Sequence, residues 1–159
     1  MKMMNAKLVL TAMVLAGWMA GCDGRPSLIP NKDASLRQTS AKFAADAAKR
    51  TYEADAPPGG EATARAEVNY TLKEIELGNL SAEDWTNVEV WVNKRYVLFL
   101  QSLPKQNKGD GYRHLNFEMF YDNQGDHLPT GLFSTKARIE TVHVFREGKM
   151  YDVTTKLAD

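Results

Sequence analysis

The spacing of apolar residues divides the chain into two parts with different periodicity. Between residues 35 and 54 the apolar positions recur at helical spacing, and Leu36, Phe43 and Ala47 fall on one stripe. Two prolines and two glycines follow at residues 57–60, a composition that ends helices. From residue 62 onward apolar and polar residues alternate, which is typical of half-buried strands. The pattern therefore predicts one helix at residues 35–56 and a β domain at residues 62–157.

The predicted helix begins with a capping signal, because Ser35 is followed three residues later by Gln38. Its apolar stripe is narrow and consists mostly of small side chains, with Ala44, Ala48 and Tyr52 beside the stripe. Such a helix either docks on the β domain or stands free as a stalk.

The clearest strand signal lies in the middle of the β domain. Val88, Val90 and Val92 form the inward face of a strand, residues 93–95 form a turn, and residues 96–100 form the returning strand. A second hairpin is predicted at the C-terminal end, where residues 147–149 connect residues 138–146 to residues 150–155.

The remaining strand signals are less regular. The apolar residues occupy even-numbered positions at residues 66–72 and odd-numbered positions at residues 75–77. This change predicts a bulge near Lys73 and Glu74. A further strand carries Leu115, Phe117 and Met119 on one side, and residues 122–125 have the composition of a turn. Six or seven short strands without intervening helices favour a mainly β fold, namely an antiparallel immunoglobulin-like β-sandwich preceded by one helix.

The N-terminal segment has the layout of an export signal. Lys2 and Lys7 precede an apolar run at residues 8–18, which is about half the roughly 20 residues that span a bilayer. Residues 19–22 end in Cys22, the single cysteine of the chain, and resemble the lipobox of bacterial lipoproteins, with Met19 where leucine is usual. The resemblance implies a signal peptide at residues 1–21, a lipid on Cys22 and a tether at residues 22–34. The alternatives are secretion with a free thiol and a retained N-terminal anchor.

Two motifs in the β domain resemble a second family. The run at residues 78–93 and the Phe120, Tyr121, Asp122 motif with Gly125 are similar to small extracytoplasmic immunoglobulin-like domains of unknown function in bacterial envelope proteins. The resemblance covers residues 68–154. It implies a fold but no catalytic residue.

The charge balance argues against a nucleic-acid partner. The chain has 20 basic and 20 acidic residues, and removal of Lys2 and Lys7 with the signal leaves 18 basic residues against 20 acidic ones. This balance provides no basic patch for nucleic acid or for anionic lipid.

The sequence carries none of the common catalytic or cofactor-binding motifs, and we expect no enzyme activity, cofactor or metal. His114, His127 and His143 lie on separate segments without ligand spacing and are interpreted as solvent-facing residues of strands or loops. Asp122 and Asp126 lack the spacing of a calcium loop, so that segment is interpreted as a plain turn.

Aromatic residues are the remaining candidates for a binding site. Because Val88, Val90 and Val92 face the core, Trp91 lies on the opposite face of its strand and needs a cover. The helix or a loop covers it, or else Trp91 forms an exposed patch with Trp85 and Tyr96 that contacts a partner protein or a glycan.

Three classes of function remain open. The leading hypothesis is a lipid-anchored, extracytoplasmic envelope lipoprotein that binds or braces another envelope protein and is anchored to membrane lipid through Cys22. The second is a carbohydrate-binding or cell-wall-binding module that uses Trp85, Trp91 and Tyr96. The third is an extracytoplasmic hydrolase whose site has no recognisable motif.

Overall fold

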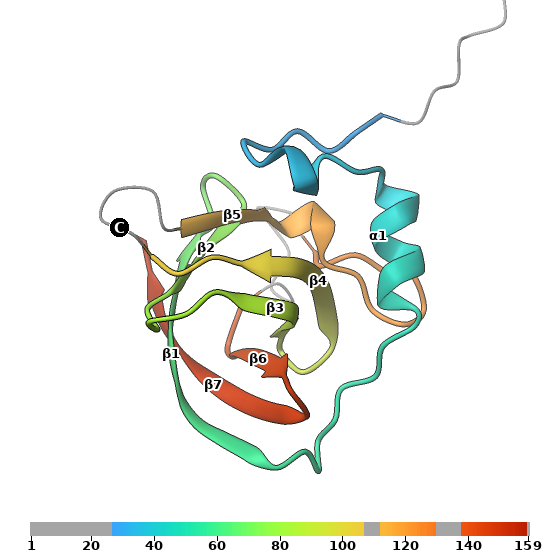
Figure 1. The fold of residues 1–159 in the computed structure, drawn as a ribbon. Helices are drawn as coiled ribbons and strands as arrows, with labels where there is room; N and C mark the ends of the chain where they lie inside the picture. The colour runs from blue at the N-terminus through green and yellow to red at the C-terminus, as the bar shows by residue number, and fades with distance from the viewer. Residues whose placement is uncertain (1–26, 107–111, 130–137, 159) are drawn as a thin grey trace, which may run out of the picture.

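The chain folds mainly into β structure. A computed structural model describes residues 27–106, 112–129 and 138–158. Seven strands form one mixed, nearly closed sheet in the order β4-β3-β6-β7-β1-β2-β5 (Figure 1). They are β1 (Pro58–Asn69), β2 (Glu74–Asn79), β3 (Trp85–Val92), β4 (Tyr96–Leu103), β5 (Tyr112–Asn116), β6 (Val142–Arg146) and β7 (Lys149–Leu157).

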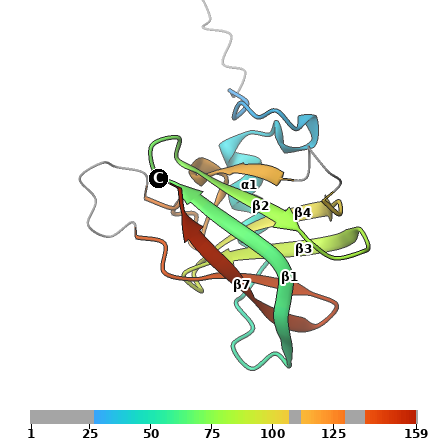
Figure 2. The same cartoon turned by 90° about the vertical axis from the view of Figure 1, so that its left-hand side faces the viewer.

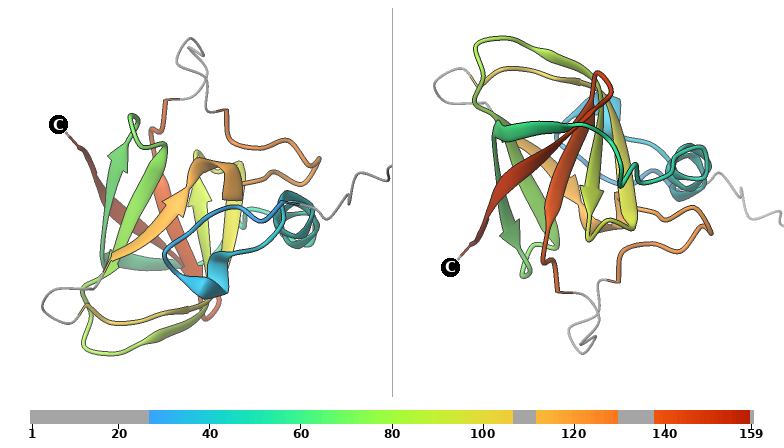
Figure 3. Two further views of the ribbon diagram at one scale, coloured as in Figure 1. Left: turned by 90° about the horizontal axis from the view of Figure 1, so that it is seen from above. Right: turned by 90° about the horizontal axis from the view of Figure 1, so that it is seen from below.

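The pairing of the first and last strands corrects the prediction of a purely antiparallel sheet. Strand β1 pairs with β2 in the antiparallel direction and with β7 in the parallel direction (Figure 2). The sheet curls so that the strands surround the core, as the two end-on views show (Figure 3). This curl brings β1 and β7, the first and last strands of the chain, side by side. They run in the same direction and therefore pair in parallel.

Both predicted hairpins are confirmed. Strands β3 and β4 are connected through Asn93 and Lys94, and β6 and β7 through Glu147 and Gly148. All four of these residues have positive φ angles, between 51° and 72°, which match the twist of hairpin turns. The β6–β7 loop has two residues, whereas the β3–β4 loop contains Arg95 as a third residue before Tyr96 pairs with Val92.

The bulge predicted near Lys73 and Glu74 is wrong, because a turn separates two strands there. Strand β1 ends at Asn69, whose side-chain oxygen accepts the Leu72 N–H at 2.9 Å. Lys73 has a φ of 55° and completes the turn into β2. The change of parity therefore marks a hairpin rather than an irregular strand.

The predicted strand with Leu115, Phe117 and Met119 on one side ends earlier than expected. Strand β5 stops at Asn116, and Phe117–Met119 forms the 3₁₀ turn η2. All three apolar side chains are nevertheless buried, because the turn keeps them directed at the core.

The predicted helix at residues 35–56 is much shorter in the structure and is divided in two. A 3₁₀ turn, η1, spans Ala34–Leu36, and the helix α1 spans Ser40–Ala47. Thr39 caps α1 by accepting the Lys42 N–H, and Asp33 caps η1 by accepting the Ser35 N–H. The Ser35 and Gln38 pair does not form a capping box, because Ser35 is already capped from upstream.

The helix docks on the sheet, which excludes the free stalk. Phe43 and Ala47 are buried, as is Leu36 from the preceding turn. Among the described residues, no helix is long and apolar enough to cross a membrane.

Two apolar clusters hold these elements together. The main core fills the interior of the curled sheet and includes Ile75, Val88, Val90 and Leu115. A smaller outer cluster lies on the opposite face of β3 and contains Ala47, Trp91 and Val97, with Tyr52 packed against it. The outer cluster attaches the helical segment to the sheet.

Candidate partner-binding groove

Strand β4 lies at one end of the sheet order and has a free edge. Near its start, Val97 exchanges two backbone hydrogen bonds with Tyr121, at 2.8 and 3.3 Å, on the side away from β3. Hydrogen-bonding direction alternates along an antiparallel strand, so Phe99 and Gln101 direct their backbone groups to the same outer side. Within the described ranges, the backbone groups of these two residues have no hydrogen-bond partner on that side.

A groove separates this free edge from the helix. Helix α1 lies beside β4 (Figure 1), and a cavity of about 370 Å³ opens between them. The strand contributes residues 97–102, and the helical segment contributes Leu36, Lys42, Phe43, Asp46 and Lys49. An edge strand that faces a helix across a groove is an arrangement that accepts an additional strand.

The charges around the groove are unevenly paired. Lys42 and Lys49 both contact Asp46, at 3.7 and 3.2 Å, and both lysines are more than half exposed. Arg50 pairs with Glu89 at 3.3 Å and lies over the ring of Phe99 at 4.1 Å. Within the described part of the chain, the two lysines therefore share one carboxylate at the mouth of the groove.

Burial raises the pKa of Glu89 at the base of this region. The hydrogen bond from Trp91 and the charge of Arg50 oppose that effect but do not cancel it, and the nearby Glu53 adds to the increase. Glu89 fixes both neighbours, since it accepts the Trp91 indole N–H at 3.1 Å as well as pairing with Arg50.

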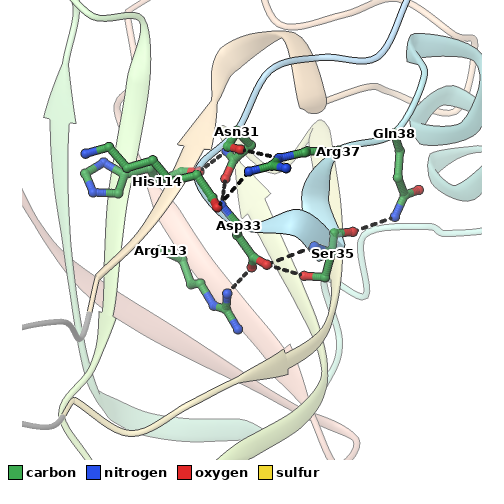
Figure 4. A network of polar contacts seen from close by, with 8 residues as sticks. Asn31, Asp33, Ser35, Arg37, Gln38, Arg113 and His114 are labelled. Carbon is green, nitrogen blue, oxygen red and sulfur yellow. Dashed lines mark hydrogen bonds and ion pairs between the residues drawn. The ribbon is translucent and has the colours of Figure 1, made fainter.

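The N-terminal segment closes the other side of the gap between the two edge strands. Asn31 donates to the backbone oxygen of His114 at 2.7 Å, and Asp33 forms an ion pair with Arg113 on β5 (Figure 4). Burial lowers the pKa of Arg113. Ile29 is buried in the main core. Residues 22–26 of the predicted tether lie outside the described residues. The rest is docked from Ile29 onward, because Ile29 is buried and the Asn31 side-chain amide bonds to β5.

The exposed aromatic patch, which was the alternative to a covered Trp91, does not form, because all three of its members are buried. Trp85 and Trp91 are each 2% exposed and Tyr96 is 8% exposed. Trp91 lies under the helical segment, and the edge of Tyr52 meets its ring at a centroid distance of 5.5 Å. The helical segment is therefore the cover that the outward position of Trp91 requires.

Trp85 lies in the main core, although strict alternation from Val88 would place its side chain on the outer face of β3. It lies three residues before Val88, yet both side chains belong to the same cluster. Asn87 lies between them with a φ of 52°, and this local reversal breaks the alternation of the strand. Arg146 covers the outer side of the Trp85 ring at 4.6 Å.

The other candidate residues have structural roles or lie outside the described part. Cys22 belongs to residues 1–26, which are outside the described residues. The turn at residues 122–125 is confirmed, and the buried Asp122 carboxylate accepts the N–H groups of Gln124 and Asp126 and two hydrogen bonds from Arg95. Burial raises the pKa of Asp122, but these hydrogen bonds outweigh it and hold the pKa below its ordinary value.

The solvent-facing interpretation of the histidines is wrong for His143. This residue is 7% exposed and packs against Tyr52, with its Nε2 atom 3.2 Å from Asp152. Burial lowers the pKa of His143, while Asp152 raises it and Lys94 lowers it further. His127 is exposed, with its ring tilted against that of Tyr121 at a centroid distance of 6.2 Å, and the partly buried His114 lies on β5.

Sequence reasoning did not find the groove, because the free edge of β4 depends on which strands lie beside it. The alternating pattern of residues 96–100 is the same for a central strand and an edge strand. The only local signal was the charge pattern of α1, where Lys42, Asp46 and Lys49 face one another.

No family model, no curated protein and no solved structure matches this chain.

Proposed function

We propose that this chain is a lipid-anchored, non-enzymatic module of the bacterial envelope that binds an extended segment of another envelope protein along β4. The observation that carries the proposal is the free backbone edge at Phe99 and Gln101 beside the groove. An extended peptide supplies backbone donors and acceptors in the spacing that such an edge needs.

The energetics of strand addition fit a binding site of modest strength. Two residues offer up to four backbone hydrogen bonds, each contributing about 0.5–1.5 kcal/mol net. Their sum is smaller than the roughly 8 kcal/mol of a micromolar complex. The partner's side chains therefore contribute the rest by filling the groove against Leu36 and Phe43.

The charge at the mouth of the groove selects the partner's chemistry. Lys42 and Lys49 share the single carboxylate of Asp46, so an acidic side chain on the incoming strand gains a partner there. We expect an extended segment with at least one aspartate or glutamate, and weaker binding at high salt because both lysines are exposed.

We propose in addition that Cys22 carries a lipid. The short segment between Cys22 and the buried Ile29 then limits how far the β domain can lie from the membrane. Seven residue steps separate Cys22 from the buried Ile29. A fully extended chain covers at most about 3.5 Å per residue, so the module lies within about 25 Å of the lipid. The partner segment is consequently one that is held near the membrane surface.

An immunoglobulin-like fold is part of the same proposal, and the strand neighbours support it. In that fold the third, sixth and seventh strands form one sheet, often with an added strand beside the third, while the first, second and fifth belong to the other. The observed neighbours β4-β3-β6-β7 and β1-β2-β5 follow this grouping. The parallel β1 and β7 pair joins the two groups into one sheet, and the buried Trp85 on β3 resembles the core tryptophan of such domains.

Site-specific photo-crosslinking in intact cells tests the groove. A photo-reactive residue at the exposed Gln101 should capture a partner, whereas one at the exposed Lys156 on β7 should not. Equal capture at the two positions, or none at Gln101, contradicts the proposal.

A proline variant tests the backbone mechanism. Gln101→Pro removes an N–H that faces away from β3, so the β3 and β4 pairing is retained while one bond to the partner is lost. The expected result is an unchanged thermal midpoint and a crosslinking yield from Phe99 that falls several-fold. The matched variant Leu100→Pro removes an inward-facing N–H and should unfold the domain. A Gln101→Pro variant that is stable and crosslinks at the original yield refutes strand addition.

The anchor is tested separately. Cys22→Ser should move the protein from the membrane to the soluble fraction, and mass spectrometry should find a lipid on Cys22 of the unaltered protein. An unmodified Cys22 in membranes contradicts this part of the proposal and leaves the groove intact.

The glycan-binding alternative is not retained, because the aromatic side chains that motivated it are buried.

A further inference from the structure

A second cluster of chemically active side chains lies on β2 and β5, at the other end of the strand order. Along β2, glutamates alternate with apolar residues. Glu74 and Glu76 lie on the outer face of the strand, and Ile75 and Leu77 lie on the inner face and fill the core. His114 on β5 is the direct pairing partner of Glu76. Its backbone oxygen is held by Asn31, and its imidazole points away from that contact toward β2 (Figure 4).

The distances in this cluster fit one metal ion. The Nδ1 atom of His114 lies 3.3 Å from a Glu74 oxygen and 3.6 Å from a Glu76 oxygen, and the three ligand atoms all lie within 4.8 Å of one another. Zinc binds nitrogen and carboxylate oxygen at about 2.0–2.2 Å, so ligands at the corners of a tetrahedron are about 3.4 Å apart. The two distances from the imidazole are close to that edge length.

The charges around the cluster also favour a cation. Neither carboxylate has a lysine or arginine within ion-pair distance in the described part of the chain, although Lys32 and Arg37 line the adjoining hollow. Arg37 is directed elsewhere, since it donates to the backbone oxygens of Asn31 and Lys32. On the next strand, Glu67 is the direct pairing partner of Glu76, but Arg65 lies 3.6 Å from the Glu67 carboxylate and offsets its charge. The negative charge left to a cation is therefore that of Glu74 and Glu76.

We propose that Glu74, Glu76 and His114 form a binding site for a divalent transition-metal ion of the zinc class. One imidazole and two carboxylates are donors that zinc accepts, and the imidazole disfavours calcium and magnesium, which take oxygen ligands. Three protein ligands leave one tetrahedral position for water or for a donor from a bound partner. The ion pins β5 to β2 beside the docked N-terminal segment.

The sequence offered only a weak signal for this site. Two glutamates separated by one residue share a face of a strand, but the histidine is 38 positions further along the chain. Strand pairing alone brings it opposite Glu76. The expectation of no metal site rested on local spacing, which cannot detect a cross-strand set.

The test is a zinc titration of the full chain, purified in detergent and stripped of metal with a chelator. Calorimetry should find one zinc ion per chain, and hundredfold saturation should raise the thermal midpoint by roughly 5–10 °C. His114→Gln retains a hydrogen-bonding side chain without the imidazole and should weaken zinc binding at least tenfold, as should Glu74→Gln. Glu67→Gln removes a carboxylate of the same face outside the site and should stay within about threefold.

Each other outcome overturns the proposal. If the unaltered chain binds no zinc at about 100 µM, which corresponds to a binding free energy of only about 5.5 kcal/mol, the cluster is a hydrogen-bonded pair and not a metal site. Equal affinity in His114→Gln places the ion elsewhere. Because Cys22 is the one thiol of the chain, the titration is repeated with Cys22→Ser, and loss of binding in that variant also refutes the site. Circular dichroism of the metal-free variants verifies that each is folded.

Discussion

Replacement of Trp91 by alanine measures how strongly the helical segment is bound to the sheet. Trp91 is 2% exposed and packs among Ala47, Tyr52 and Val97. A buried tryptophan removes about 200 Å² from water, which at about 25 cal/mol/Å² gives an upper limit near 5 kcal/mol. Measured losses for large aromatic residues replaced by alanine are about 3–5 kcal/mol. We therefore expect Trp91→Ala to lower the free energy of unfolding by about 3–5 kcal/mol.

Urea denaturation followed by circular dichroism tests this value. The matched control is Leu72→Ala, because Leu72 is an apolar residue that is 63% exposed, and it should change the free energy by less than about 0.5 kcal/mol. A loss below about 1 kcal/mol for Trp91→Ala refutes the reasoning, since it means that the helical segment does not cover Trp91 in solution. Limited proteolysis after Arg50 should also accelerate in the variant if the segment is released.

The remaining predictions concern buried polar groups. Asn79 is fully buried, donates to the backbone oxygens of Glu83 and Leu103 and accepts two bonds from Ser81, so Asn79→Ala should cost about 2–4 kcal/mol in urea denaturation; a cost under 1 kcal/mol contradicts this role. Asp122→Asn weakens charge-assisted bonds and should cost about 1–2 kcal/mol at pH 7. That difference should shrink as the pH falls below the ordinary value of 3.8 and through the lowered folded-state pKa, and a constant difference across the acid range argues against it. Because burial lowers the pKa of His143, the unfolded chain takes up the proton first, and stability is lost as the pH falls from the ordinary value of 6.5 toward the folded-state pKa. His143 contributes at most about 1.4 kcal/mol per pH unit to the slope of the free energy of unfolding against pH. His143→Gln should therefore flatten this slope between pH 7 and pH 5, and an unaltered slope means that His143 is not the titrating group.

The hydrogen bonds of the buried Asn79 explain why the motif at residues 78–93 indicates a fold rather than a catalytic site. Asn79 secures the corner before β3 by bonding to Glu83 and to Leu103 at the end of β4. An asparagine that satisfies four bonds inside the fold is committed to architecture. The same holds for Asp122, whose turn contacts are local in sequence and were therefore predictable.

The sequence by itself determined the local features of this protein. The apolar alternation at Val88, Val90 and Val92 predicted both the hairpin and the outward position of Trp91, because side-chain direction in a strand follows directly from position. Helix length was the local feature that failed, since Asp33 and Thr39 cap two separate turns.

Only the tertiary structure decided which residues are available for function. Burial of Trp91 depends on a segment about 40 residues earlier in the chain. The edge at Phe99 is free because none of the described strands lies on the outer side of β4. The Glu74, Glu76 and His114 cluster likewise exists through the register between β2 and β5. Exposure, edge position and cross-strand proximity are properties of the packed sheet, and a one-dimensional pattern records only which face a side chain occupies, not what lies opposite it.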